Sequence, residues 1–489
     1  MLERLLAKKT DFSELEDENG PKLKRTLGPW GLTALGIGAV IGGGIFVITG
    51  QAAAEHAGPA IVLSFIIAAV CCSFTALCYA EFATLIPMSG SSYSYAYATL
   101  GELAAWFIGW NMVLEYGVSA SAVAVSWTGY FTSLLDHFGL HLPEVLTNAP
   151  LAFVDNHLVI TGALFNLPAV AIVLVLTWLC YIGIRESSGT NTAMVALKVA
   201  LIIIVIIAGW HYVNPQLWHP FIPENAGEEK YGWSGIMRGA TLVFFSYIGF
   251  EATSTAAQEA KNPQRDLPIG TLASLAICTI LYVGMAAVLT GLLSFDQLGT
   301  SEPVVTAVKA HAELGWLRWL VEIGALIGLS SVVLVMIIAQ PRIFMIMGCD
   351  GMLPPVFAKI HPKYRTPHIN TVITGIGIAA LAAIFPLDIL GDLVSMGTLI
   401  AFVAVCLGVM ILRKTAPDAP RTFRVPIAPV TCTLGVLSCL MLLYWENWYN
   451  WTLMIAWTVI GIAIYFGYGY RHSKLRTGKT PQTTVPSTP

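Results

Sequence analysis

Three ionisable side chains lie inside long apolar stretches of this sequence and are the first candidates for chemistry. They are Lys198, Glu115 and Glu251. An ion buried among apolar groups is costly, so such groups are usually paired or functional. Buried lysines readily change their protonation state, which makes Lys198 a candidate for proton-linked work. Glu115 is its natural complementary charge, although a structural ion pair or a hydrogen-bonded carboxyl explains Glu115 equally well.

A run of three glycines is the second unusual feature. Gly42, Gly43 and Gly44 follow Val40 and Ile41 in an apolar stretch, where each glycine costs about 1 kcal/mol of helix stability relative to alanine. Close packing through small residues requires a spacing of four rather than a consecutive run. The run therefore predicts an unwound segment that exposes backbone N–H and C=O groups to a ligand. A dinucleotide fingerprint is excluded, because the spacing differs and no strand precedes it.

A comparable interruption is predicted in the stretch 241–255. Phe245, Ser246 and Ile248 lead into Gly249 and Glu251, with three hydroxyl residues close behind. The alternative is an intact helix whose Ser and Thr side chains bond back to their own carbonyls. A carboxyl inside an apolar stretch favours the functional interpretation.

Two such breaks together define a ligand class. Exposed N–H groups at the start of a half-helix attract an anion such as a carboxylate, and exposed carbonyls at the end of another half-helix attract an ammonium. A ligand that carries both groups a few ångströms apart is an α-amino acid. The backbone does not determine which side chain this amino acid has.

The composition places these groups in a membrane. Of 489 residues, 56% are hydrophobic and 11% are charged, and the mean hydropathy is +0.71. Soluble domains carry about 25% charged residues, so an ordinary soluble enzyme is excluded. The net charge of −3 gives no support for nucleic-acid binding. The sequence also contains no nucleophile–base pair, metal-ligand spacing or phosphate loop, so neither an enzyme nor a cofactor is expected.

Continuous apolar runs of about 20 residues predict membrane-spanning helices and exclude a barrel, whose strands alternate. We expect twelve spans, at about 31–53, 60–85, 102–135, 166–184, 191–211, 235–258, 268–294, 316–347, 370–386, 389–413, 426–445 and 450–470. With the N-terminus inside, the cytoplasmic segments contain all Lys and Arg residues except Lys198, Lys230, Arg238, Lys309 and Arg318. The positive-inside rule therefore predicts that both termini face the cytoplasm of a cell-membrane protein.

The two interrupted spans are the first and the sixth, five apart. Discontinuous helices at matching places in two halves are typical of inverted repeats with a binding site near the membrane midplane. We therefore expect a cytoplasmic segment 1–28, a first repeat 29–211, a second repeat 234–413, two additional helices in 425–471 and a disordered cytoplasmic tail 472–489. The nine cysteines are interpreted as small packing residues, without disulfides or metal.

The eighth span supplies one further candidate. Met336 lies in the run that also holds Ser330 and Ser331. It either packs in the core or closes one wall of a ligand pocket, since a thioether suits both roles. Lys198 is expected to lie against the first and eighth spans, unless its long side chain reaches to the inner interface instead.

Several motifs resemble the amino acid–polyamine–organocation superfamily. They are the glycine-rich first span, the segment Phe245–Glu251 and the segment Glu259–Gly270. The segments Tyr79–Ala83 and Pro87–Tyr93 are similar to bacterial members of the cationic amino acid transporter branch. The resemblance covers nearly the whole chain. It implies an all-α fold with two five-helix inverted repeats, two extra helices, and discontinuous helices 1 and 6.

The resemblance also implies roles for individual residues. The substrate carboxylate would accept from the amides of Gly43 and Gly44, and the ammonium would donate to the carbonyls of Val40, Phe245 and Ile248. Phe245 would act as an aromatic gate. The remaining residues expected to line this site are Ile41, Gly42, Ser246 and Met336.

Lys198 would stand where sodium-coupled relatives bind an ion, so the resemblance implies proton coupling, with Glu115 and Glu251 as secondary candidates. Met336 departs from the smaller residue expected in transporters dedicated to arginine and lysine. The predicted function is a secondary active L-amino acid transporter, for small neutral substrates and possibly cationic ones. The alternatives are an exchanger, a sodium symporter and a membrane amino acid sensor.

Overall fold

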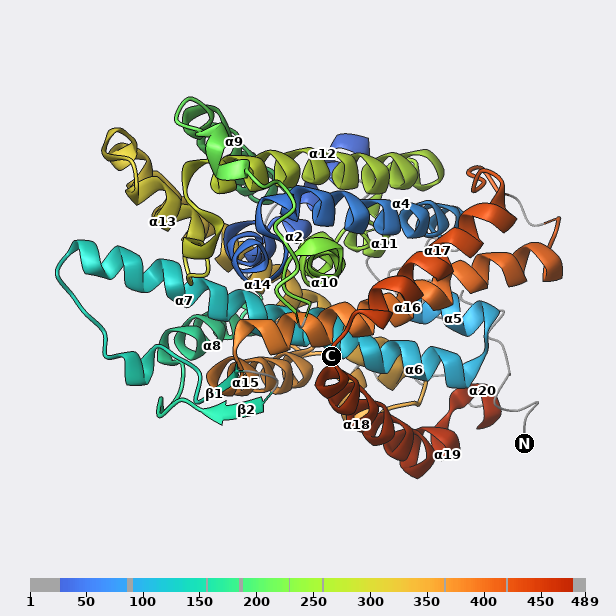
Figure 1. The fold of residues 1–489 in the computed structure, drawn as a ribbon. Coiled ribbons are helices and arrows are strands. Elements are labelled where there is room, and N and C mark those ends of the chain that lie inside the picture. The colour runs from blue at the N-terminus through green and yellow to red at the C-terminus, as the bar shows by residue number, and fades with distance from the viewer. Residues whose placement is uncertain are drawn as a thin grey trace.

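The computed structural model describes residues 27–85, 91–154, 157–183, 188–227, 229–256, 259–364, 366–418 and 421–477. Helices dominate this part of the chain and pack side by side in one bundle (Figure 1). The predicted N-terminal segment lies almost wholly outside the described residues, as does the tail beyond Thr477. Of the predicted tail, the residues up to Thr477 include a short helix, α20 (Lys474–Thr477).

Among the described residues, six helical segments are long and apolar enough to cross a membrane. They are Gly44–Leu85, Thr192–Trp210, Pro263–Leu292, Ala312–Cys349, Leu387–Thr415 and Trp448–His472. Four shorter apolar helices accompany them, at Pro29–Val40, Leu167–Tyr181, His368–Ile384 and Ala428–Tyr444. The chain is therefore a multi-pass membrane protein, and the count of twelve spans stays a prediction.

The first half of the chain contains most of the irregular helix. Its first elements are α2 (Pro29–Val40), the π-helix η2 (Gly44–Ile48), α3 (Thr49–Ala52), the π-helix η3 (Ala53–Ala57), η4 (Gly58–Ala60) and α4 (Ile61–Leu85). These are followed by α5 (Ser91–Thr99), α6 (Glu102–Met112), the π-helix η5 (Val113–Val118), α7 (Ser119–His137), α8 (Leu167–Tyr181) and α9 (Ser188–Trp210). Gly58, with φ of +59°, reverses the chain between η3 and α4.

The connection between α7 and α8 contains a two-stranded sheet, and an isolated β-bridge joins Leu27 to Ala260. Strands β1 (Leu151–Val154) and β2 (His157–Ile160) pair antiparallel, with Leu151 opposite Ile160 and Val154 opposite His157. The sequence analysis did not predict this hairpin, because strands of four residues carry no long periodic pattern.

The second half continues with longer helices. They are α10 (Gly232–Phe244), η8 (Phe245–Tyr247), α11 (Ala252–Thr255), α12 (Pro263–Leu292), α13 (Pro303–Lys309), α14 (Gly315–Cys349), α15 (His368–Ile384) and α16 (Leu387–Thr415). The chain ends with α17 (Ala428–Tyr444), α18 (Trp448–Ile464), the π-helix η13 (Tyr465–Gly469), α19 (Tyr470–His472) and α20.

Packing places the two interrupted segments at the centre. Helix α12 lies against α4, α2 and α9, and α14 lies against α7, α9 and α15. In Figure 1, α2 and α10 lie near the middle of the bundle and α18 lies at its edge, and η2 contacts both α10 and η8. One large apolar cluster extends through the bundle, and a smaller one gathers around Leu32 and Leu267.

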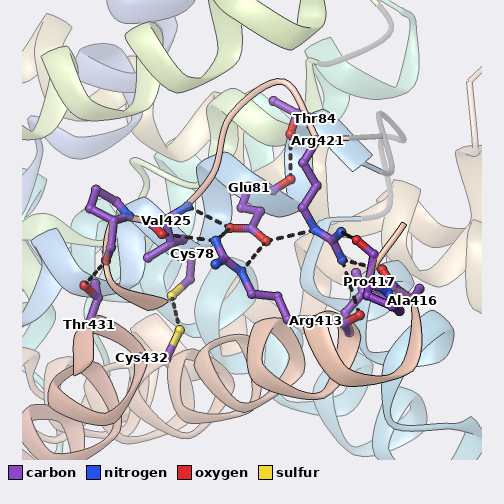
Figure 2. A network of polar contacts seen from close by, with 12 residues as sticks. Cys78, Glu81, Thr84, Arg413, Ala416, Pro417, Arg421, Val425, Thr431 and Cys432 are labelled. Atoms are coloured by element: carbon purple, nitrogen blue, oxygen red, sulfur yellow. Dashed lines mark hydrogen bonds and ion pairs between the residues drawn. The ribbon is translucent and has the colours of Figure 1, made fainter. Parts of the chain in front are cut away.

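A network of charged residues around Glu81, here called the clamp, joins α4 to the end of α16 (Figure 2). Arg413 at the end of α16 donates from Nε and Nη2 to the two carboxylate oxygens of Glu81 in α4, at 3.1 and 2.6 Å. Arg421 forms an ion pair with the same carboxylate at 3.3 Å, and the amide of Val425 donates to it at 2.7 Å. The carboxylate of Glu81 thus anchors the connection between α16 and α17 to α4.

Candidate functional site

The first interruption lies at the glycine run. Helix α2 ends at Val40, Ile41 is extended with φ of −74° and ψ of 98°, and η2 begins at Gly44. The first N–H groups of a helix have no acceptor within that helix. The glycine run thus lies at an interruption of the helix, as the sequence predicted, and binding of an anion by the amides that follow it stays a prediction.

The second interruption lies beside the first. Helix α10 gives way to the 3₁₀ turn at Phe245, after which Ile248 is extended and Gly249 has φ of +120°. A Cβ on Gly249 would lie 2.9 Å from the carbonyl carbon of Ala39, and one on Gly44 would collide with Ser246. The two breaks therefore approach each other backbone to backbone, which larger side chains would prevent.

The hydroxyl of Tyr282 bridges the two breaks. It lies 3.0 Å from the carbonyl oxygen of Val40 and 2.8 Å from that of Ser246. A phenol has one proton and can donate to only one carbonyl at a time. The sequence analysis missed Tyr282, because a lone tyrosine in α12 carries no pattern that distinguishes it from a packing residue.

Lys198 binds the first break directly. Its ammonium donates to the carbonyl oxygens of Gly38 at 3.0 Å and Ile41 at 3.1 Å. The side chain is 1% exposed, and its stem packs on Gly328 of α14. The structure thus places Lys198 against the first and eighth predicted spans and not at an interface.

The two membrane carboxyls face each other. Glu115 lies in the π-helix η5, and its carboxyl is within reach of the carboxyl of Glu251. The amide of Gly249 donates to Oε2 of Glu251 at 3.0 Å. Both oxygens of Glu115 and Oε1 of Glu251 have no hydrogen-bond partner in the described part of the chain. Glu115 therefore lies beside Glu251 rather than in an ion pair with Lys198, whose ammonium donates to the carbonyls of Gly38 and Ile41.

Helix α14 forms the wall opposite the first break. A Cβ on Gly42 would lie 3.4 Å from Val332, one helical turn before Met336, so both residues lie on the same face of α14. Met336 is fully buried. On the other side, a Cβ on Gly43 would lie 2.6 Å from Oγ of Ser126 in α7.

Further polar groups continue from the carboxyl pair, and the sequence analysis did not single them out. Asn111 lies one turn before Glu115, and Gln340 lies one turn after Met336. Both amides are buried and have no hydrogen-bond partner among the described residues. For Asn111 the available signal was its spacing of four from Glu115, and for Gln340 it was a polar side chain inside an apolar span.

Comparison with known proteins establishes the family. A model of the family described as amino acid permease matches residues 27–468. This chain belongs to the amino acid permease family. The permease is similar to the branched-chain amino acid permease BcaP of Bacillus subtilis, at 46% identity over 93% of this chain and 95% of the relative.

Two other relatives of the permease have different names. The methylthioribose transporter of Bacillus subtilis is 44% identical over 93% of this chain and 95% of its own length. Cationic amino acid transporter 4 of Arabidopsis thaliana, a vacuolar protein, is 36% identical over 88% of this chain and 69% of the relative. The relatives are transporters rather than enzymes, and the resemblance found in the sequence is confirmed.

Proposed function

We propose that this permease is a secondary active transporter of L-amino acids that works by alternating access and is coupled to protons. The observation that carries the proposal is the contact between two interrupted helices, which leaves backbone donors and acceptors at membrane depth. Unwound backbone is tolerated there only where it is buried in protein or lines a cavity. We place this site at the midplane of two inverted repeats.

Substrate binding would use both breaks. The carboxylate would accept from the amides of Gly43 and Gly44, and the ammonium would donate to the carbonyls of Val40, Phe245 and Ile248. Tyr282 already contacts the Val40 carbonyl, but a carbonyl oxygen has two lone pairs and can accept from both. Phe245, buried beside the break, would close over the bound substrate.

Lys198 would couple the site to protons. Its ammonium stands among backbone carbonyls where a bound cation would find its ligands. Hydrogen bonds from a charged donor are about twice as strong as those from a neutral donor. Protonated Lys198 would therefore hold α2 against α9, and loss of the proton would weaken this hold and allow the first segment to move. Glu115 and Glu251 are the second candidates for proton exchange.

The substrate class follows from the pocket wall. Met336 fills the space that a long cationic side chain would need, which favours small neutral substrates such as alanine over arginine and lysine. The names of the relatives include branched-chain and cationic amino acids as well as methylthioribose. We place the permease in the cell membrane, with twelve spans and both termini in the cytoplasm.

The test is uptake of alanine and arginine into proteoliposomes, with and without an inward proton gradient. Wild-type permease is compared with Lys198→Ala and with Lys359→Ala, which removes an exposed lysine from the α14–α15 connection. Gradient-driven alanine uptake that is lost only in Lys198→Ala supports the proposal. Uptake that requires internal amino acid whatever the gradient identifies an exchanger, and a sodium requirement identifies a sodium symporter. Saturable binding without uptake identifies a sensor.

A further inference from the structure

An apolar cavity lies far from the helix breaks, between α6 and α18. Its volume is about 330 Å³. The walls include Leu103, Trp106, Phe107 and Trp110 of α6, with Gly461 and Ile462 of α18. Helix α18 lies at the edge of the bundle (Figure 1), and Ile462 is 41% exposed. The cavity therefore opens toward the surrounding membrane.

The cavity is suited to hydrocarbon and not to water. The indole N–H of Trp106 donates to the carbonyl of Gly461, and that of Trp110 donates to the carbonyl of Trp457, both at 2.9 Å. The indole donors of the wall are thus already used. An apolar cavity without free polar partners stays dry, and an empty one forfeits dispersion contacts along its lining.

The cavity persists because its rigid walls cannot collapse into it. The rings of Trp110 and Trp457 stack with their centroids 4.3 Å apart, and Trp106 packs on Tyr465. The indole of Trp110 occupies the position that a Cβ on Gly461 would take. The aromatic rings are therefore held by stacking and by hydrogen bonds to the backbone of α18, which leaves the remaining space for another molecule.

Basic residues lie at one end of this cavity. The hydroxyl of Ser473 donates to the Glu102 carboxylate at 2.5 Å, one residue before Leu103 of the cavity wall. Exposed Arg471 lies two residues before Ser473, and half-buried Lys474 follows it directly. Glu102 itself is fully buried and also accepts from the hydroxyl of Tyr465 at 2.9 Å. The acidic group is therefore enclosed, whereas the basic side chains are presented at the surface.

We propose that this cavity binds an acyl chain of an anionic phospholipid whose phosphate meets Arg471 and Lys474. The wall of α6 from Leu103 to Trp110 extends about 10 Å along the helix, within the roughly 15 Å of hydrocarbon in one leaflet. A phospholipid supplies both required parts, an alkyl chain for the dry cavity and an anion for the basic end. Basic residues beside membrane spans attract anionic lipids in this way.

The test measures retained lipid. Purified permease from vesicles with equal phosphatidylglycerol and phosphatidylcholine is analysed by native mass spectrometry. We expect wild type to retain phosphatidylglycerol at least threefold over phosphatidylcholine. Ala104 of α6 also lines the cavity. Ala104→Phe should therefore fill the cavity and lose one bound lipid per chain, whereas Ala456→Phe on an exposed face of α18 should lose none. The double variant Arg471→Gln/Lys474→Gln leaves the cavity intact and should retain lipid without the preference.

Three outcomes would overturn the proposal. One is equal retention by wild type and Ala104→Phe, and another is the absence of a preference for phosphatidylglycerol in wild type. The third is a dimer that Ala104→Phe dissociates, since this assigns the cavity to a second copy of the chain. The charge variant tests the headgroup contact independently of any effect that Ala104→Phe has on folding.

Discussion

The ammonium of Lys198 donates to the carbonyl oxygen of Ile41 at 3.1 Å, at the first residue where α2 has lost its helical geometry. A carbonyl freed by the break would otherwise lack a partner in a region without water. The lysine therefore stabilises the interrupted form of the first segment. Any process that changes the charge on Lys198 also changes the stability of the break.

Replacement of Lys198 by arginine keeps the positive charge but removes the ability to lose the proton. The guanidinium of arginine remains protonated, and the close approach of Gly328 to the lysine stem leaves little space for it. We expect Lys198→Arg to retain some exchange of internal for external alanine and to lose gradient-driven accumulation. Paired exchange and accumulation assays in proteoliposomes measure this. Normal accumulation by the arginine variant would remove Lys198 from proton coupling.

Met336→Ser is expected to increase arginine uptake relative to alanine uptake. The smaller side chain opens space one helical turn from Val332, which packs on Gly42. Met347→Ser is the matched control, because Met347 is also a buried methionine of α14 but packs on Gly109. The ratio of arginine to alanine uptake is the readout. If both variants change the ratio equally, the effect is general loosening and Met336 is not a pocket residue.

The facing carboxyls of Glu115 and Glu251 predict strong coupling in a double-mutant cycle. Each carboxyl is buried, so Glu→Gln at either position changes the protonation required of the other. We expect an interaction energy in the range of about 0.5–3 kcal/mol from the alanine Kd of the two single variants and the double variant. Additive effects would show that the two carboxyls act independently. The pH dependence of uptake should change in both single variants.

Tyr282→Phe tests the bridge between the two breaks. The ring that packs on Phe65 and Tyr247 is kept, while the carbonyls of Val40 and Ser246 lose the hydroxyl. An unsatisfied buried acceptor costs about 1–3 kcal/mol. We therefore expect a higher KM for alanine together with lower thermal stability.

Tyr247→Phe is the control for this variant. Tyr247 lies in the 3₁₀ turn of the second break, but its hydroxyl donates to the carbonyl of Phe65 in α4 at 3.0 Å and not to a carbonyl of either break. If Tyr247→Phe destabilises the protein to a similar extent but leaves the KM for alanine unchanged, the higher KM of Tyr282→Phe results from the lost bridge between the two breaks. Equal KM values for the two variants would contradict that role.

The sequence predicted the breaks because their cause is local. Three consecutive glycines after Val40, and the Ser–Gly–Glu pattern near Glu251, weaken a helix wherever they occur. The sequence also predicted that Lys198 is buried against the first and eighth spans, because a charged residue in an apolar run requires polar partners. These predictions required no knowledge of how distant segments meet.

The contacts between segments could not be predicted in the same way. Tyr282 reaches Val40 across the bundle, and Glu115 faces Glu251 rather than Lys198, because helix rotation determines which side chains meet. The π-helix that contains Glu115 shifts this rotation locally. The hairpin of β1 and β2 was also missed, since its strands are too short for a periodic signal.

The clamp around Glu81 makes the last prediction. Its carboxylate, 1% exposed, is shared by Arg413 and Arg421 and by the amide of Val425 (Figure 2). Loss of one partner of a buried ion pair costs about 3–5 kcal/mol, because the other charges stay behind. Arg413 is partly exposed to solvent, so the lower end of this range is expected for Glu81→Ala.

Asp136→Ala is the control for Glu81→Ala, because Asp136 pairs with His141 on the surface. Exposed pairs contribute about 0–1 kcal/mol, so the melting temperature of this variant should stay near that of wild type. Thermal unfolding in detergent compares the two. A Glu81→Ala protein as stable as Asp136→Ala would mean that water replaces the carboxylate and that the connection between α16 and α17 is held by other contacts. If Glu81→Ala loses much stability but binds substrate with normal affinity, the clamp stabilises the fold and does not take part in substrate binding.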